Sequence, residues 1–159
     1  MRMPNKVNIA DLYFAHRIPN PINITLTFKL QVDGQRLDQI TAVQNVKHFR
    51  NRLNRHLYGN AHRRFRKELK LFVVHEGLDW TRHHIHAIIE RPAGLSVDEF
   101  ITLVTTTWAQ TRFGYSEHHY EVPISTDREV DWVYYILKKR TKADLASSVD
   151  WENSSCFGR

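Results

Sequence analysis

The sequence predicts an α+β fold in which one antiparallel sheet carries helices packed on one of its faces. Along some stretches, apolar and polar residues alternate, which is the period of a strand with one buried face. Along others, apolar residues recur every three to four positions, which is the period of an amphipathic helix. These stretches follow one another as strand, helix, strand, strand, helix, strand, helix. Two β-α-β halves in this order typically form such a sandwich.

The first half of the chain supplies a strand, a helix and a second strand. Apolar side chains alternate over residues 22–32, and Asp33 and Gly34 end that stretch. From residue 37 to residue 57 they recur at helical spacing. Residues 69–77 form a short apolar run that ends in glycine, which indicates the second strand.

The third strand, residues 83–90, follows closely enough for a hairpin that turns around Asp79 and Trp80. Ser96 with Glu99 three residues later is a capping box that begins the second helix. This pattern is typical of ferredoxin-like or RNA-recognition-type folds, and it leaves the other face of the sheet open.

Residues 116–125 are a weaker fourth strand, and Asp127 is placed to cap a last helix over residues 128–145. The chain has 159 residues, 42% of them hydrophobic, which is enough for one core and too few for two. We therefore expect an irregular segment at 1–21, one domain at 22–145, and a polar tail at 146–159 that frays.

Composition also limits the setting and the partners. The lone Cys156 excludes a disulfide framework and fits a reducing compartment. No apolar run reaches membrane-spanning length and the N-terminus lacks a secretory pattern, so we expect a soluble protein without a membrane partner.

Lys and Arg number 23 against 17 Asp and Glu, a formal net charge of +6, which favours nucleic acid as partner. One segment is densely basic and interleaved with aromatic residues. Its candidate DNA-binding residues are Arg50, Arg52, Arg55, Arg63, Arg64, Arg66 and Lys67. A merely solvated helix face is the alternative.

Three histidines begin the third strand. Because side chains alternate along a strand, His84 and His86 share one face while Ile85 and Ala87 share the core face. The hairpin brings Glu76 toward this pair. Two imidazoles and one carboxylate leave positions open at a divalent ion, as in a catalytic site, and Mn²⁺ or Mg²⁺ is the expected ion. Alternatively, the histidines are half-exposed polar residues, and His83, on the core side, receives no role.

The last predicted helix carries Tyr134, Tyr135 and Lys138. Lys138 follows Tyr135 by three residues and Tyr134 by four, so it lies near both rings. A phenol, with a pKa of about 10, attacks a phosphate only with help, which a metal ion and a lysine can give. An amphipathic helix with half-buried aromatic residues is the alternative explanation.

Together these features resemble the HUH endonuclease domain of rolling-circle replication initiators, the Rep proteins. The similarity covers residues 22–140 and consists of three motifs in order. They are the strand "ITLTF" at 24–28, His84-Ile85-His86, and Tyr135-Ile136-Leu137-Lys138.

The resemblance implies a metal-dependent enzyme that nicks and joins single-stranded DNA at a replication origin through a 5′-phosphotyrosine. The residues carried over are the metal ligands His84, His86 and Glu76, the nucleophile Tyr135 with Tyr134 as its alternative, and Lys138 as a phosphate-side or metal-side partner. The sequence has no GxxxxGK[ST] motif, so no nucleotide cofactor is expected, and unwinding would fall to a separate helicase working with host replication proteins.

Such a protein would act in the cytoplasm of a prokaryotic host, or in the nucleus if a eukaryotic virus encodes it. Three other functions stay open from the sequence. A single-tyrosine HUH transposase shares the chemistry, a non-catalytic single-stranded nucleic-acid-binding module shares the fold, and a structural adaptor would use its charge only for solubility.

Overall fold

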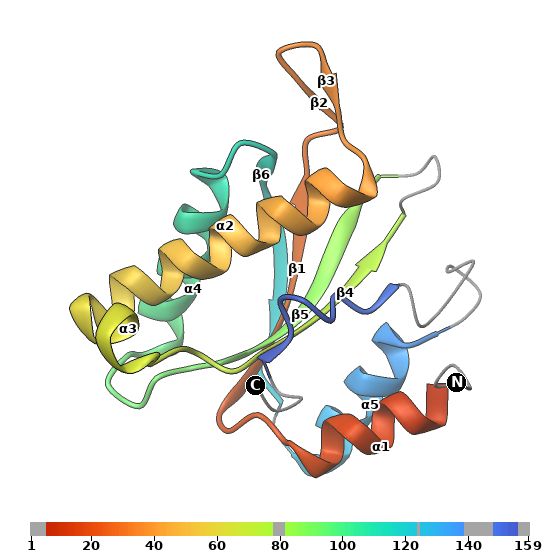
Figure 1. Ribbon diagram of the computed structural model, residues 1–159. Coiled ribbons are helices and arrows are strands. Elements are labelled where there is room, and N and C mark those ends of the chain that lie inside the picture. Colours follow the sequence, from red (N-terminus) through yellow and green to blue (C-terminus); the bar gives the residue numbers. More distant parts are fainter. Residues whose placement is uncertain (1–5, 78–81, 124, 139–147, 156–159) are drawn as a thin grey trace.

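The structure, a computed structural model, describes residues 6–77, 82–123, 125–138 and 148–155. Its centre is a four-stranded antiparallel sheet with the strand order β4-β5-β1-β6 (Figure 1). The strands are β1 (Pro21–Phe28), β4 (Leu71–Glu76), β5 (His84–Glu90) and β6 (Gly114–Glu121). The predicted α+β class is confirmed, and the strand order is compatible with a ferredoxin-like fold.

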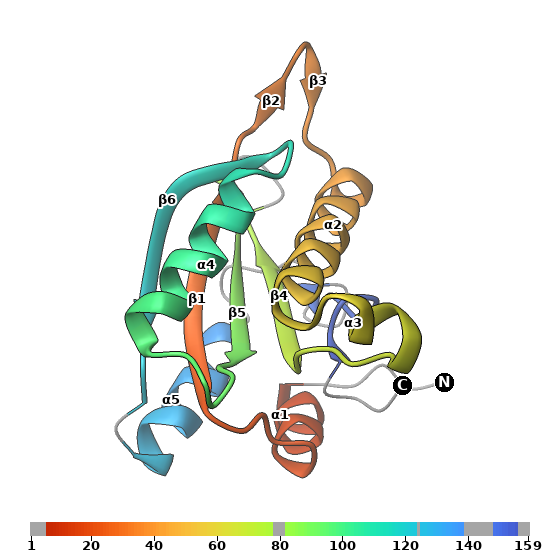
Figure 2. The same cartoon turned by 90° about the vertical axis from the view of Figure 1, so that its left-hand side faces the viewer.

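Two long helices cover one face of the sheet, as predicted. These are α2 (Gln39–Tyr58) and α4 (Val97–Ala109), seen side by side in Figure 2, with the short α3 (Asn60–Phe65) after α2. Apolar side chains from both helices and from β1, β4 and β5 form the larger core. At its centre Trp108 is 1% exposed, and its indole N–H donates to the carbonyl of Thr27 at 2.9 Å. The predicted capping box of Ser96 and Glu99 begins α4.

The opposite face is partly covered, so the prediction of an open face is wrong for half of the sheet. Helices α1 (Lys6–Ala15) and α5 (Thr126–Ile136) lie against it (Figure 1). A second apolar cluster joins Phe72, Val74 and Ile88 of the sheet to both helices. On the same face, the side chains of Asn23 and Thr25 on β1 line a pocket instead.

The N-terminal segment is therefore not irregular throughout. Ile9, Ala10 and Tyr13 are fully buried at helical spacing on α1. The Tyr13 hydroxyl donates to the carboxylate of Glu129 on α5 at 3.2 Å, and Arg17 forms an ion pair with the same carboxylate. This buried Glu129 joins α1 to α5, a contact between residues more than a hundred positions apart that local periodicity does not reveal.

The C-terminal residues 148–155 do not fray but pack along the outer edge of β4. Asp150 N donates to the carbonyl of Val73 at 2.9 Å, while Val73 N donates to the Ser154 hydroxyl at 3.0 Å. Leu71 N donates to the Ser155 hydroxyl at 2.9 Å. The polar composition that suggested a solvated tail instead satisfies the backbone groups of an edge strand.

Several element ends also differ from prediction. β1 ends at Phe28 because β2 (Gln31–Val32) and β3 (Gln35–Arg36) form a separate hairpin. Asp33 and Gly34 make its turn, with φ values of 50° and 79°, as two-residue hairpin turns require.

The last helix begins after the N-cap Ser125, whose hydroxyl accepts from Arg128 N, and not after Asp127. The helix ends at Ile136, with Leu137 as its C-cap, so the predicted helical conformation of Leu137 and Lys138 is wrong. The predicted turn at Asp79 and Trp80 and the rest of the predicted helix, residues 139–145, lie outside the described residues. Within the described part of the chain, no helix is both long enough and apolar enough to cross a membrane.

Candidate metal centre and tyrosine

Strand pairing places the predicted metal ligands next to one another. Glu76 on β4 is the direct cross-strand partner of His84 on β5, and His86 lies two residues further along the same face. One ligand atom from each of the three lies within 4.8 Å of the others. Glu76 Oε2 is 3.2 Å from His86 Nε2 and 3.9 Å from His84 Nε2. The three side chains thus converge on one point.

Hydrogen bonds on the far side of each ring orient the histidines. His84 Nδ1 is 3.0 Å from the carbonyl oxygen of Arg82. A carbonyl only accepts, so Nδ1 carries the proton, and a neutral His84 presents a bare Nε2 toward Glu76. His86 Nδ1 is 3.1 Å from the hydroxyl of Thr25, its cross-strand neighbour on β1. The tautomer of His86 sets the role of its other ring nitrogen, Nε2, which either donates a hydrogen bond to Glu76 Oε2 at 3.2 Å or presents a lone pair to an ion.

Burial in the cluster is graded. The side chains of Glu76 and His86 are only 9% and 7% exposed, while that of His84 is 25% exposed. The other oxygen of the Glu76 carboxylate, Oε1, lies 3.8 Å from Lys138 Nζ. Two nitrogens and one carboxylate that are accessible from the His84 side suit a divalent ion with open positions. The residues present therefore fit a divalent cation.

Tyr135 lies beside this cluster. Its ring meets the ring of His86 edge-on, with 5.8 Å between the centroids, and the residue is 53% exposed. Lys138 Nζ lies 4.0 Å from the centroid of the Tyr135 ring. Lys138 therefore contacts both the tyrosine and the Glu76 carboxylate. It stands just beyond the end of α5, where its backbone N–H still donates to the Tyr135 carbonyl at 3.3 Å.

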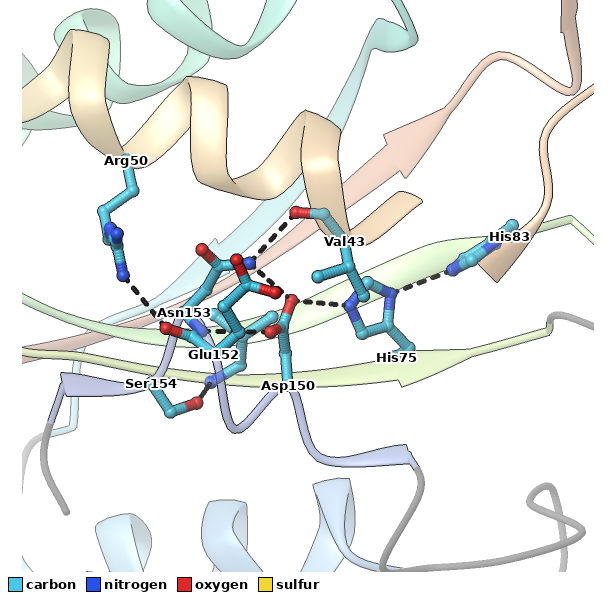
Figure 3. A network of polar contacts seen from close by, with 9 residues as sticks. Val43, Arg50, His75, His83, Asp150, Glu152, Asn153 and Ser154 are labelled. Atoms are coloured by element: carbon cyan, nitrogen blue, oxygen red, sulfur yellow. Dashed lines mark hydrogen bonds and ion pairs between the residues drawn. The ribbon is translucent and has the colours of Figure 1, made fainter. Parts of the chain in front are cut away.

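A second histidine pair, which sequence reasoning missed, lies on the opposite face of the same strands (Figure 3). His75 Nε2 is 2.9 Å from Asp150 Oδ2, and His75 Nδ1 is 3.1 Å from His83 Nε2. Burial, and then the neighbouring His75 and His84, lower the pKa of His83 to about 3. His83 is therefore neutral at pH 7, and it packs against Phe28 with 4.6 Å between ring centroids. The one sequence feature that could have indicated this buried pair was the position of His83 on the core side of the third strand.

The predicted DNA-binding residues are not brought to the tyrosine. Arg50 is buried, and its Nη1 donates to the Glu152 carbonyl at 3.1 Å, so its guanidinium serves the packing of the C-terminal segment. Arg52 donates to Gln110 of α4 at 2.8 Å. The other basic residues are exposed on α2, on α3 and just after it, across the sheet from α5 (Figure 2), and are Arg55, Arg63, Arg64, Arg66 and Lys67.

No protein-family model matches the chain, and neither a curated protein nor a solved structure does so significantly.

Proposed function

We propose that this protein is a metal-dependent endonuclease of the HUH type that nicks and rejoins single-stranded DNA at a replication origin. The observation that carries the proposal is the position of Tyr135. Its ring lies against His86, one of three converging ligand side chains, and Lys138 contacts both the tyrosine and Glu76. A nucleophile, a cation and a divalent-ion site within one contact shell are what phosphodiester transfer to tyrosine needs.

His84, His86 and Glu76 would hold the ion, which is Mn²⁺ or Mg²⁺ in this proposal. When bound, such an ion polarises a phosphoryl oxygen and stabilises the negative charge that develops on it. The hydrogen bonds of Arg82 and Thr25 keep both imidazoles turned toward that position.

Tyr135 supplies the nucleophile. Its phenol gives its proton to solvent water, a bond forms between its oxygen and the phosphorus, and the bond from phosphorus to the 3′ oxygen breaks. The 3′ oxygen takes up a proton, so the products are a 5′-phosphotyrosine and a free 3′-hydroxyl. The reverse sequence rejoins a strand, and no oxidant or nucleotide is consumed. At more than half exposure, the Tyr135 ring is accessible to a DNA strand.

Lys138 lowers the barrier in both directions. Its ammonium lies over the Tyr135 ring and near the Glu76 carboxylate, so it is held between the nucleophile and the ion site. A fixed positive charge there stabilises the phenolate before attack and the added charge on the phosphate during attack.

The proposed setting follows from the reaction. The substrate is single-stranded DNA, so a separate helicase and host replication proteins would provide it. The protein would act in the cytoplasm of a prokaryotic host, or in the nucleus if the replicon belongs to a eukaryotic virus.

A covalent-adduct assay tests the proposal without knowledge of the origin. The protein is mixed with a random-sequence single-stranded DNA library and Mn²⁺ or Mg²⁺, and a denaturing gel separates protein linked to DNA. We expect an adduct that EDTA and Tyr135→Phe each abolish. Tyr134→Phe is the matched control, since Tyr134 is its chain neighbour, and should retain the adduct. Absence of any adduct from the unmodified protein with either ion would refute the proposal, and loss in Tyr134→Phe alone would reassign the nucleophile.

A further inference from the structure

A pocket of about 420 Å³ opens beside Tyr135, between β1, β6 and α5. One end is lined by His86 and Tyr135, which belong to the candidate site. The other end is lined by side chains to which no role has been given above. These are Asn23, His119, Glu121, Arg128, Asp131 and Trp132.

Strand register accounts for the position of the pocket. Asn23 lies opposite Glu121 in the pairing of β1 with β6. On the other side of β1, Asn23 pairs with Ile88, which belongs to the apolar cluster under α1 and α5. The apolar half of the face is therefore covered, while the polar half, beginning at Asn23, stays accessible.

The pocket lining carries hydrogen-bond acceptors on Asn23, Glu121 and Asp131. It also carries a donor, the indole N–H of Trp132, whose nitrogen is buried without a hydrogen-bond partner among the described residues. The Oδ1 atom of Asn23 is buried and has no hydrogen-bond partner among the described residues. Asp131 adds an exposed carboxylate. Glu121 accepts from Arg128 at 2.8 Å, and this bond lowers the pKa of the Glu121 carboxyl, so the group stays ionised. A buried amide oxygen without a partner is unfavourable unless a bound molecule brings a donor to it.

The charges decide which part of a DNA strand fits. Two carboxylates repel a phosphate, and the guanidinium of Arg128 is already engaged by one of them. A nucleobase carries no charge, and an exocyclic amino group offers N–H donors to an amide oxygen or a carboxylate. Thymine lacks that group and places two carbonyl oxygens beside its single ring N–H, which carboxylates disfavour.

We propose that this pocket binds one base next to the phosphate attacked by Tyr135, and selects a base with an exocyclic amino group over thymine. The inference rests on the proposed function, because Tyr135 lines both sites. It adds a specificity-determining group, the Asn23 amide, that the chemistry at the metal centre does not require.

Sequencing the DNA in the covalent adducts tests the selection. With the unmodified protein, one position beside the cleavage point should be depleted of thymine by roughly tenfold, the discrimination a good side-chain pair to a base gives. Asn23→Leu removes the amide but none of the proposed metal ligands, and should let thymine return at that position. Asp131→Asn, at an exposed helix position, should weaken the depletion without endangering folding. Unchanged depletion in both variants would overturn the inference.

Binding without chemistry separates this inference from the proposed function. Tyr135→Phe protein is titrated with two fluorescent oligonucleotides that differ only by adenine or its amino-free analogue purine at the selected position, or at each position in turn if no adduct forms. We expect roughly tenfold weaker binding of the analogue, lost in Asn23→Leu. Discrimination without any adduct would keep the pocket and refute the nuclease. Equal binding of both oligonucleotides would refute the pocket alone.

Discussion

On each face of the β4-β5 hairpin two histidines meet one carboxylate, and the two sets have opposite characters. One set is His84, His86 and Glu76, and the other is His75, His83 and Asp150. Residues 75 and 76 are neighbours on β4, and residues 83 and 84 are neighbours at the start of β5. Alternation of side chains alone sends one member of each pair to either face.

The sets differ in connectivity. Around Glu76, both imidazoles approach the same carboxylate oxygen, at 3.2 and 3.9 Å, so an ion can be shared by all three groups. Around His75, the groups form a chain in which each of its ring nitrogens has its own partner, Asp150 on one side and His83 on the other (Figure 3). Residue types that favour a metal site can therefore hold an ion only where they converge, and elsewhere they build a buried polar network.

The largest expected effect is on metal binding by Glu76→Gln. This change removes the carboxylate on which both imidazoles converge, and we expect Mn²⁺ affinity to fall by more than about a hundredfold, or about 2.7 kcal/mol, since even outer-shell partners are worth tenfold or more. Calorimetric titration with Mn²⁺ measures it. His83→Phe is the matched control on the opposite face and should keep affinity within about threefold. A similar loss in both variants would contradict the distinction between the faces.

The second prediction concerns Asp150→Asn. Asp150 Oδ2 accepts from His75 and from Asn153 Nδ2, so an amide NH₂ in its place would face two donors, and we expect a loss of about 2 kcal/mol of unfolding free energy. Urea denaturation measures this loss. Glu152→Gln is the control, because its exposed ion pair with Lys47 should be worth less than about 1 kcal/mol. Equal stability of the two variants would show that the buried network contributes little.

The third prediction concerns Thr25→Val, which keeps the side-chain shape but removes the hydroxyl beside His86 Nδ1. The ring then loses its orienting partner, and Mn²⁺ affinity should fall about tenfold, or about 1.4 kcal/mol. Thr105→Val is the control. It makes the same change on α4, on the other face of the sheet, where the hydroxyl donates to carbonyls of its own helix. The same titration compares them, and unchanged affinity in Thr25→Val would show that the hydroxyl does not orient the ligand.

The last prediction is a pH dependence from the buried pair, whose effect is the smallest when it is taken per pH unit. The pKa of His83 in the folded protein, about 3, is below its unfolded value of about 6.5, so the unfolded chain binds more protons between these values. The stability contributed by neutral His83 is complete above about pH 6.5 and is lost as the pH falls toward 3. We expect unfolding free energy, measured in EDTA, to fall by roughly 1 kcal/mol per pH unit below pH 6. His83→Phe should flatten this slope, and an unchanged slope would contradict the assignment.

Sequence patterns predicted the parts of the candidate site that depend on residues close together in the sequence. Alternation along β5 and a short hairpin suffice to place Glu76, His84 and His86 together, since register follows from parity. Helical spacing likewise predicts Lys138 near Tyr135, and the two are in contact although Lys138 lies beyond the end of α5.

The rest depends on contacts between distant parts of the chain. Asp150 reaches His75 only because residues 148–155 satisfy the open edge of β4, and Arg50 is buried for the same reason. The same holds for α1, whose burial depends on α5 and its Glu129. Local periodicity carries no information on which polar segment completes an edge strand.

The adjacency of residues 75 and 76, and of 83 and 84, has a consequence for cooperativity. Each of these peptide bonds joins one residue of the buried network to one candidate ligand. A movement of the backbone that pulls one set apart therefore also displaces the other set. Detachment of the C-terminal segment removes Asp150 from His75 and so loosens the backbone that holds Glu76. Metal release and opening of the β4 edge should therefore belong to one local unfolding unit, with hydrogen exchange at Val73 and at the ligand strand slowed together when Mn²⁺ is added.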